Sequence, residues 1–279
     1  MMLDVLSLVS DTFSRKMAEE FRRAYGTTGA NYVEIIDSAA RAALERIGNS
    51  DALYHNVEHT LLVTQVGWDI LRGKRLHEKV DAEDAVHFLL ACLVHDIGYV
   101  KGICSGDTAN NVVITETGQT MDWPRGASDA CLQPYHVDRS KIFIMERISI
   151  HEQLDAERLS RAVELTRFPV PHDTDHQETN TEAGLVRAAD LVGQLGDPLY
   201  LKKSKALFCE FEEIGINKQI GLESPADLVE QYPNFFWTQA YPYMKPALRY
   251  LDCTVSGRDW IAHLFRNVFS AEHINDGLI

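Results

Sequence analysis

The chain has 279 residues, of which 45% are hydrophobic, so it is long enough and apolar enough to bury a full core. Its formal net charge of −14 argues against a dedicated nucleic-acid-binding protein, because no basic cluster is available to neutralise phosphates. The five cysteines are widely spaced and form no C-x-x-C pair, which favours a reduced, cytoplasmic protein over a disulfide scaffold. No apolar stretch approaches the ~20 residues of a membrane span, and the first residues do not resemble a signal peptide, so we expect no membrane association.

Apolar residues recur at helical spacing along most of the chain. We expect Asp11 to cap the first helix and a loop to contain Pro225. The pattern predicts an all-α protein with helices over residues 11–26, 31–48, 55–73, 81–98, 138–153, 155–166, 182–195, 198–215, 234–251 and 257–269.

Helical spacing fails between Gly98 and Tyr135, where Gly, Asp, Asn and Thr are frequent. A short β-hairpin around residues 112–123 is the regular structure that we predict there. A loop of this length within a compact domain is usually functional or mobile. Because we find no internal repeat and no low-complexity linker, we expect one domain over residues 1–279, with its core at about 50–200 and helical extensions on both sides.

The doublet His95-Asp96 ends the most apolar of the predicted helices, in LLACLVHDIGY. Adjacent ionisable groups in a buried position are expensive to desolvate, so they need a partner, hydrogen bonds or a metal ion. A pair that simply caps the helix is the alternative. The residues around the doublet decide between these two interpretations.

His55 and His59 are four residues apart, so a helix would place both on one face. Imidazoles from His59 and His95, with carboxylates from Asp96 and a later acid, would make a mixed nitrogen and oxygen site. That ligand set suits Mn, Fe, Zn, Ni or Mg. Asp190, in LVRAADLVGQL, is the candidate for the later acid, although by itself it could be an ordinary surface residue.

The joint pattern resembles the HD-domain phosphohydrolases, whose signature is H…HD…D on separate helices, over roughly Tyr54 to Leu195. The resemblance implies an all-α HD-domain helical bundle. It also implies one divalent metal ion held by His59, His95, Asp96 and Asp190. Asp96 would bridge this ion to a second one.

Within that superfamily, YHNVEH is similar to the Y-H-N-x-x-H motif of the class I cyclic nucleotide phosphodiesterases, and AADLVGQLGDP is similar to the segment with their final Asp. The match implies that His55 is the general acid and that His59 binds metal. In the C-terminal part, the resemblance nominates Gln239 as the residue that reads a purine. The aromatic residue that the family has three positions later is Pro242 here.

The chain departs from those phosphodiesterases after the doublet, where Tyr99 to Lys101 stand in place of another histidine. HDIGYVK is closer to the H-D-I-G-K of other HD hydrolases, so Lys101 is a candidate to neutralise the phosphate, as is Arg139. His136 and His151 occupy the middle of the two-metal layout H…HD…H…H…D. Of these two candidate ligands for a second ion, we favour His151, because a continuous helix would keep the two histidines about 22 Å apart.

A competing motif covers the same residues. His55 to His59 also reads H-x-x-E-H, the zinc signature of inverted metalloproteases, with Glu58 as base. That interpretation leaves His95-Asp96 unexplained and expects a much larger protein with a sheet. The chain has no G-x-S-x-G, no phosphate-binding glycine loop and no dinucleotide fingerprint.

These observations predict an enzyme that hydrolyses a phosphate ester of a small substrate, most simply a nucleotide or cyclic nucleotide, with water activated by one or two divalent ions. Two other classes stay open. A di-iron oxygenase uses the same ligand set, and two irons with oxygen consumption would identify it. A non-catalytic nucleotide sensor would bind its ligand tightly without turnover. Fold alone does not choose among the three.

Overall fold

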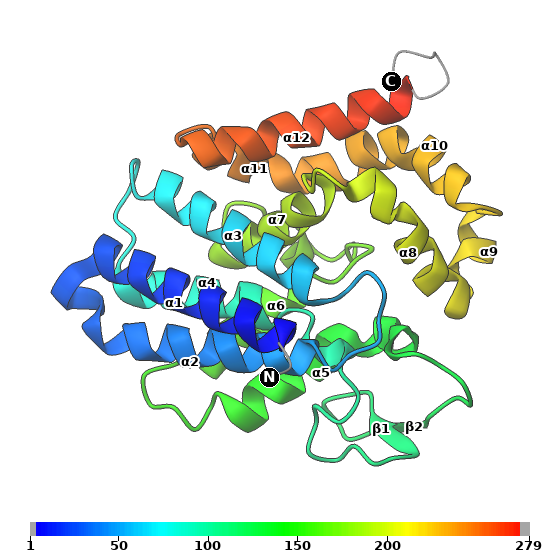
Figure 1. The fold of residues 1–279 in the computed structure, drawn as a ribbon, viewed down its shortest axis with the longest axis horizontal. Helices are drawn as coiled ribbons and strands as arrows, with labels where there is room; N and C mark the ends of the chain where they lie inside the picture. Colours follow the sequence, from blue (N-terminus) through cyan, green and yellow to red (C-terminus); the bar gives the residue numbers. More distant parts are fainter. Residues whose placement is uncertain (1–3, 274–279) are drawn as a thin grey trace.

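The protein is all-α apart from one two-stranded hairpin within the part that the computed structural model describes, residues 4–273, which confirms the predicted fold class (Figure 1). None of the helices in this part is both long and apolar enough to cross a membrane. The helices in chain order are α1 (Val5–Tyr25), α2 (Ala30–Ile47), α3 (Val57–Lys74), α4 (Ala82–Val94), α5 (His136–Arg147), α6 (Ala156–Glu164), α7 (Glu182–Leu195), α8 (Tyr200–Glu213), α9 (Ile216–Ile220), α10 (Pro225–Phe235), the π-helix η5 (Phe236–Ala240), α11 (Tyr241–Leu251) and α12 (Val255–Glu272).

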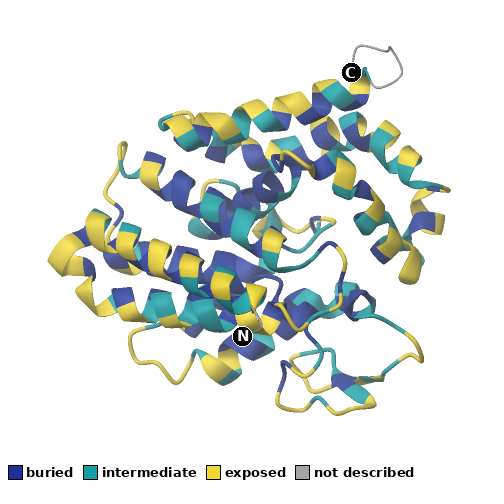
Figure 2. Ribbon diagram, viewed as in Figure 1, coloured by how far each residue is buried: buried dark blue, intermediate teal, exposed yellow. Residues whose placement is uncertain are grey.

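Helix α4 lies inside the bundle because its sequence is apolar on almost every side. Every residue from Ala85 to Val94 is buried, and helices α2, α3, α6 and α7 pack around them. The hairpin of α1 and α2 covers one side of this group, while α11 and α12 pack on α3 and α7 (Figure 1). Figure 2 shows the result, with buried positions along the inner helices and exposed positions on the outward faces of α1, α2 and α12.

Helices α3 and α7 approach each other very closely. A Cβ atom placed on Gly193 of α7 would lie 2.8 Å from the Cα atom of Val63 in α3, which is shorter than a real Cβ contact. Val63 is one turn after His59, and Gly193 is one turn after Asp190. The missing side chain of Gly193 therefore lets these two polar residues face each other across the interface.

Helices α8, α9 and α10 form a wall beside the bundle, drawn in yellow in Figure 1. Helix α8 packs on α9 and α10, and α10 packs on α12. Pro225, which we expected in a loop, is instead the first residue of α10. The helix starts there because Ser224 and Asp227 form a capping box, and because proline fits the first helical position.

Two predicted helix starts within the first 60 residues are also wrong. The first helix begins at Val5, because Asp4 rather than Asp11 supplies the cap and accepts a hydrogen bond from the backbone of Ser7 at 3.1 Å. The third begins at Val57, because Asn56 caps it. His55 therefore lies before the helix that carries His59, and the two do not share a helix face.

The predicted hairpin is present in the long segment after α4. Strands β1 (Asn111–Val113) and β2 (Thr120–Asp122) pair antiparallel, with Val112 opposite Met121. Val112 is buried, so the hairpin is packed onto the rest of the protein through this side chain.

Arg139 of α5 holds this long segment in place. Its side chain is fully buried and donates hydrogen bonds to the backbone carbonyls of Gly98 at 2.7 Å, Val100 at 2.9 Å and Val113. It also donates to both carboxylate oxygens of Asp107, at 3.1 and 2.8 Å. Burial raises the pKa of Asp107, but the hydrogen bonds and charge of Arg139 outweigh it and leave that pKa below its usual value. Arg139 is thus a structural residue, and our suggestion that it binds a phosphate is wrong.

We predict that Arg139→Met lowers the free energy of unfolding by about 3–5 kcal/mol, because Asp107 loses its partner in a buried position. A lowered carboxylate pKa stabilises the fold above the unfolded value of about 3.9 and stops doing so as the pH falls through the folded value. The variant should therefore lose part of the acid sensitivity of the wild type. Denaturant unfolding at pH 7 and below pH 4 measures both effects. Arg147→Met, at the exposed end of the same helix, is the control, and equal stabilities of the two variants would contradict the prediction.

Candidate functional site

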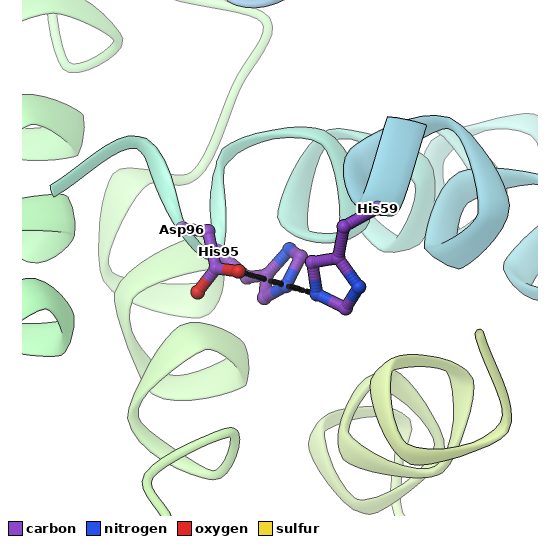
Figure 3. A group of neighbouring side chains, drawn as sticks. All are labelled: His59, His95 and Asp96. Atoms are coloured by element: carbon purple, nitrogen blue, oxygen red, sulfur yellow. Dashed lines mark hydrogen bonds and ion pairs between the residues drawn. The ribbon is translucent and has the colours of Figure 1, made fainter. Parts of the chain in front are cut away.

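Four ionisable side chains meet where α3, α4 and α7 come together. His59 lies in the first turn of α3, behind the Asn56 cap. His95 and Asp96 directly follow the last residue of α4, and Asp190 lies within α7. Figure 3 shows His59, His95 and Asp96 pointing toward one another. The helix ends therefore place these side chains together, as the sequence pattern indicated.

The atoms that could bind a cation are at nearly equal distances. Oδ2 of Asp96 is 3.2 Å from Nε2 of His59 and 3.1 Å from Nε2 of His95. Oδ1 of Asp190 is 3.3 and 3.5 Å from the same two nitrogens, which are 3.4 Å apart. Ligand atoms about 2.1 Å from one ion are about 3.0 Å apart in octahedral and about 3.4 Å apart in tetrahedral coordination. The donor atoms of His59, His95 and Asp96 lie within 4.8 Å of one another and have the spacing that a single ion requires. Asp190 adds an oxygen that is 3.3 and 3.5 Å from the two imidazoles.

The charges in this cluster depend on one another. Burial disfavours every charged form, but the carboxylates outweigh it, raising the pKa of His59 and raising that of His95 well above its usual value. In return, the imidazoles hold the pKa of Asp96 well below its usual value and lower that of Asp190. Each acid is therefore stabilised as a carboxylate only because positive charge lies beside it.

The hydrogen-bonding pattern of the cluster also favours a bound cation. Nδ1 of His95 donates to the carbonyl oxygen of Cys92 at 2.9 Å, which leaves the Nε2 lone pair directed at the other donors. Oδ2 of Asp96 is buried and forms no well-directed hydrogen bond. A buried carboxylate oxygen without a hydrogen bond is costly unless a cation binds it. Three imidazole and carboxylate donors, His59, His95 and Asp96, thus make a suitable site for a divalent metal ion.

His136 lies on the other side of Asp96. Gly98 makes this possible, because a Cβ atom there would lie 1.9 Å from the carbonyl oxygen of His136. Nδ1 of His136 donates to the carbonyl oxygen of Gln133 at 2.5 Å, and its Nε2 is 3.6 Å from Oδ1 of Asp96. Burial lowers the pKa of His136, which favours the neutral form that binds metals.

His151 lies elsewhere. Helix α5 ends at Arg147, not at residue 153 as the spacing suggested, and His151 is exposed in the turn that follows. The structure therefore reverses our preference, since His136 rather than His151 is beside the cluster. The reason is that His136 begins its helix at the close contact with Gly98, whereas His151 follows the end of the same helix.

His55 pairs with Glu210, a residue that the sequence analysis did not single out. Nδ1 of His55 donates to Oε2 of Glu210 at 2.6 Å, while Oε1 accepts from the backbone nitrogens of Tyr54 at 2.6 Å and His55 at 3.3 Å. Burial raises the pKa of Glu210, but His55 and these backbone donors outweigh it and lower that pKa. The available signal was an acid within the apolar stretch ALFCEF of α8.

Tyr99 lies between the two histidines. Its ring stacks on His55 with centroids 4.5 Å apart and an angle of 9° between the planes, and on His136 at 4.6 Å and 24°. Tyr99 fixes the orientation of His55 relative to His136.

Lys101 is not in the site. Its ammonium group donates to the carbonyl oxygen of Ala109 at 2.8 Å and lies 4.0 Å from the ring centre of Trp123, so it stabilises the loop that precedes β1. The helical turn Ile97–Tyr99 after the doublet directs the chain away before Lys101 is reached. The structure therefore does not bring Lys101, our candidate to neutralise a phosphate, to the cluster.

A cavity of about 350 Å³ opens beside the cluster. His55, Asp96, His136 and Asp190 line it at the bundle, and α8, α9 and α10 line it opposite. Gln239 of η5 also lines the cavity, as its proposed role requires, although its side chain is exposed and contacts Thr238. The volume is within the range of small-molecule sites.

A family model described as Npun_R2479-like matches residues 3–274, which is nearly the whole chain. No curated protein matches significantly.

Proposed function

The chain belongs to the Npun_R2479-like family, and we propose that it is a metal-dependent phosphohydrolase that cleaves a phosphate ester bound in the cavity. The observation that carries this proposal is the convergence of His59, His95, Asp96 and Asp190, in which each imidazole lies 3.1 to 3.5 Å from both carboxylates. Asp96 and Asp190 of this group line that cavity. The resemblance of Tyr54 to Leu195 to the HD-domain phosphohydrolases supports the same chemistry.

His59, His95, Asp96 and Asp190 would hold one divalent ion. Two imidazoles and two carboxylates suit Mn, Fe, Zn, Ni or Mg rather than a thiolate-preferring metal. A divalent ion bound there lowers the pKa of a water molecule and neutralises charge on a phosphoryl group. The carbonyl of Cys92 keeps His95 in the tautomer that such binding needs.

Asp96 and His136 would contribute to a second ion. Oδ2 of Asp96 faces the first group of donors, whereas Oδ1 faces Nε2 of His136 at 3.6 Å. A carboxylate with one oxygen toward each side is the usual bridge in sites that hold two ions about 3.5–4 Å apart.

His55 would supply the proton to the leaving group. Its Nδ1 is held by Glu210, so Nε2 is the nitrogen available to a substrate in the cavity. The buried carboxylate of Glu210 stabilises positive charge on the ring and fixes its orientation. Tyr99 packs against the ring face and prevents rotation away from the cavity.

We predict that the protein, purified without chelator, binds divalent metal, and that substitution of a donor removes it. His59→Ala, His95→Ala, Asp96→Ala and Asp190→Ala should each weaken metal binding by more than about 100-fold, beyond the loss of an outer partner alone. Metal analysis and circular dichroism check binding and fold together. His172→Ala, at an exposed loop position, is the control. Stoichiometric metal in a His95→Ala, Asp96→Ala double variant would disprove the site.

The second ion gives a sharper comparison between two histidines. His136→Ala should reduce the metal content by one ion per chain and lower activity, because Asp96 then has no partner on that side. His151→Ala, which changes an exposed histidine just beyond the same helix, should leave both unchanged. Metal titration by calorimetry measures the stoichiometry. Equal metal content in the two variants would contradict the role of His136, and one ion per chain in both would show that the site holds a single ion. Two irons with oxygen consumption would favour an oxygenase instead.

The role of His55 predicts a dependence on the leaving group. His55→Ala should reduce the hydrolysis of an alkyl phosphate ester by about 10²–10⁴-fold but reduce that of a 4-nitrophenyl ester much less, because nitrophenolate needs little protonation. Glu210→Gln should show a smaller loss of the same kind. Glu212→Gln, at an exposed position of the same helix, is the matched control. Metal content should stay constant in all three variants, and equal losses on both esters would refute the acid role.

A further inference from the structure

The cavity beside the cluster has two chemically different ends. The ionisable residues described above are at one end. The other end is formed mainly by apolar side chains of α8, α9, α10 and the intervening turn, namely Leu207, Phe211, Ile216, Leu222, Leu228 and Phe235. Tyr200 of α8 and Gln231 and Tyr232 of α10 also line the cavity. This arrangement suits a molecule with a polar head and an apolar body, because each part would then leave water for a matching surface.

The charges around the cavity limit the number of negative charges that the polar head of the ligand can carry. No lysine or arginine is among the described residues that line it, and its acidic residues are Asp96 and Asp190. Lys203, on the neighbouring side of α8, is already paired with Glu58 at 2.9 Å and Asp197 at 2.6 Å. A diphosphate or triphosphate chain would therefore lack cationic side chains beyond the ions themselves. A single phosphate group is the charge that this end can accommodate.

The volume of the cavity limits the size of the apolar part of the ligand. Its volume of about 350 Å³ is roughly twelve times the ~30 Å³ that one water molecule occupies in the liquid. A medium-length hydrocarbon chain or a small ring system fills such a space. Filling it with apolar groups would displace water from the leucine and phenylalanine side chains, which is favourable.

We propose that the substrate is a monophosphate ester of an apolar alcohol, with the phosphate at the ionisable end and the hydrocarbon between α8, α9 and α10. The phosphate part of this proposal rests on the proposed function. In the reaction, the oxygen of a water molecule forms a new bond to phosphorus and the bond to the alcohol oxygen breaks. His55 gives its proton to the alcohol oxygen and is then reprotonated by the proton that the attacking water loses. The products are the apolar alcohol and inorganic phosphate.

A nucleotide is the competing occupant. The hypothesis of a bound nucleotide depends on Gln239, which is exposed and has Thr238 as its hydrogen-bond partner at 3.5 Å. The amides of Gln133, Gln194 and Gln231 and the hydroxyl groups of Tyr200 and Tyr232 also line the cavity. The six apolar side chains of the wall, however, offer no hydrogen bond to a base or a ribose that leaves water. The observations therefore favour the hydrocarbon.

The experiment is a binding series with n-alkylphosphonates from ethyl to decyl, which cannot be hydrolysed, measured by calorimetry on the full chain with Mn²⁺. Affinity should rise roughly two- to fourfold for each added methylene until the cavity is full, because each one is transferred out of water. Binding should saturate at one molecule per chain. Affinity that does not change with chain length would overturn the proposal, as would tighter binding of a cyclic nucleotide than of decylphosphonate.

Two neighbouring residues of α10 provide the matched variants. Leu228 lines the cavity, whereas Val229, also partly buried, packs against the core without lining it. Leu228→Asn should weaken decylphosphonate binding at least tenfold and leave ethylphosphonate unchanged, while Val229→Asn should affect neither. Equal effects of the two variants would contradict the proposed position of the chain, and thermal unfolding verifies that both are folded.

Hydrolysis is measured separately, as phosphate release from ethyl and decyl phosphate. The phosphonate series reports binding without turnover. The apolar ligand site and the phosphohydrolase activity can therefore be refuted separately. A length-dependent affinity without phosphate release would support the apolar site and refute the phosphohydrolase. Phosphate release that is independent of chain length would support the phosphohydrolase and refute the apolar site.

Discussion

The arrangement of this protein depends on a compact group of buried charges at the end of its most apolar helix. His95 and Asp96 follow the last residue of α4 at a buried position inside the bundle, where neither side chain could remain ionised alone. They are compensated by His59 from α3 and Asp190 from α7, which requires the two helices to lie unusually close. Gly193 allows that approach. The polar cluster and the tight packing of α3 on α7 are thus one structural solution.

The sequence predicted the parts of this solution that are recorded in local patterns. The almost wholly apolar run before His95 identified α4, and the resemblance to the H…HD…D signature nominated His59, His95-Asp96 and Asp190 as residues that meet. The all-α class and the short hairpin were also accessible, because helical periodicity and turn residues are local signals. A contact between distant segments needs a pattern that is already known, and the H…HD…D signature supplied it here.

Other features depend on details of packing that periodicity does not contain. The sequence favoured His151 over His136 as a ligand, but His136 begins α5 beside Asp96 and His151 follows the end of that helix. Glu210 is one of several acids in α8, and only the folded chain shows that it is buried against His55. Lys101 is near Asp96 in the sequence, yet the turn after Asp96 directs it to Trp123. In each case one helix boundary or one turn decides the position of a charged group.

The wall formed by α8, α9 and α10 has a consequence for how the protein could diversify. The donors of the charged cluster come from the first 190 residues, whereas the apolar lining of the wall comes from residues 207–235. Substitutions in the wall, such as a change in the size of Leu228 or Phe235, leave His59, His95, Asp96 and Asp190 untouched. Glu210 is the exception, since it stands in the wall but serves His55. Descendants of one ancestor could therefore inherit the same chemistry and acquire different ligand preferences by altering a single contiguous stretch, provided that Glu210 is retained.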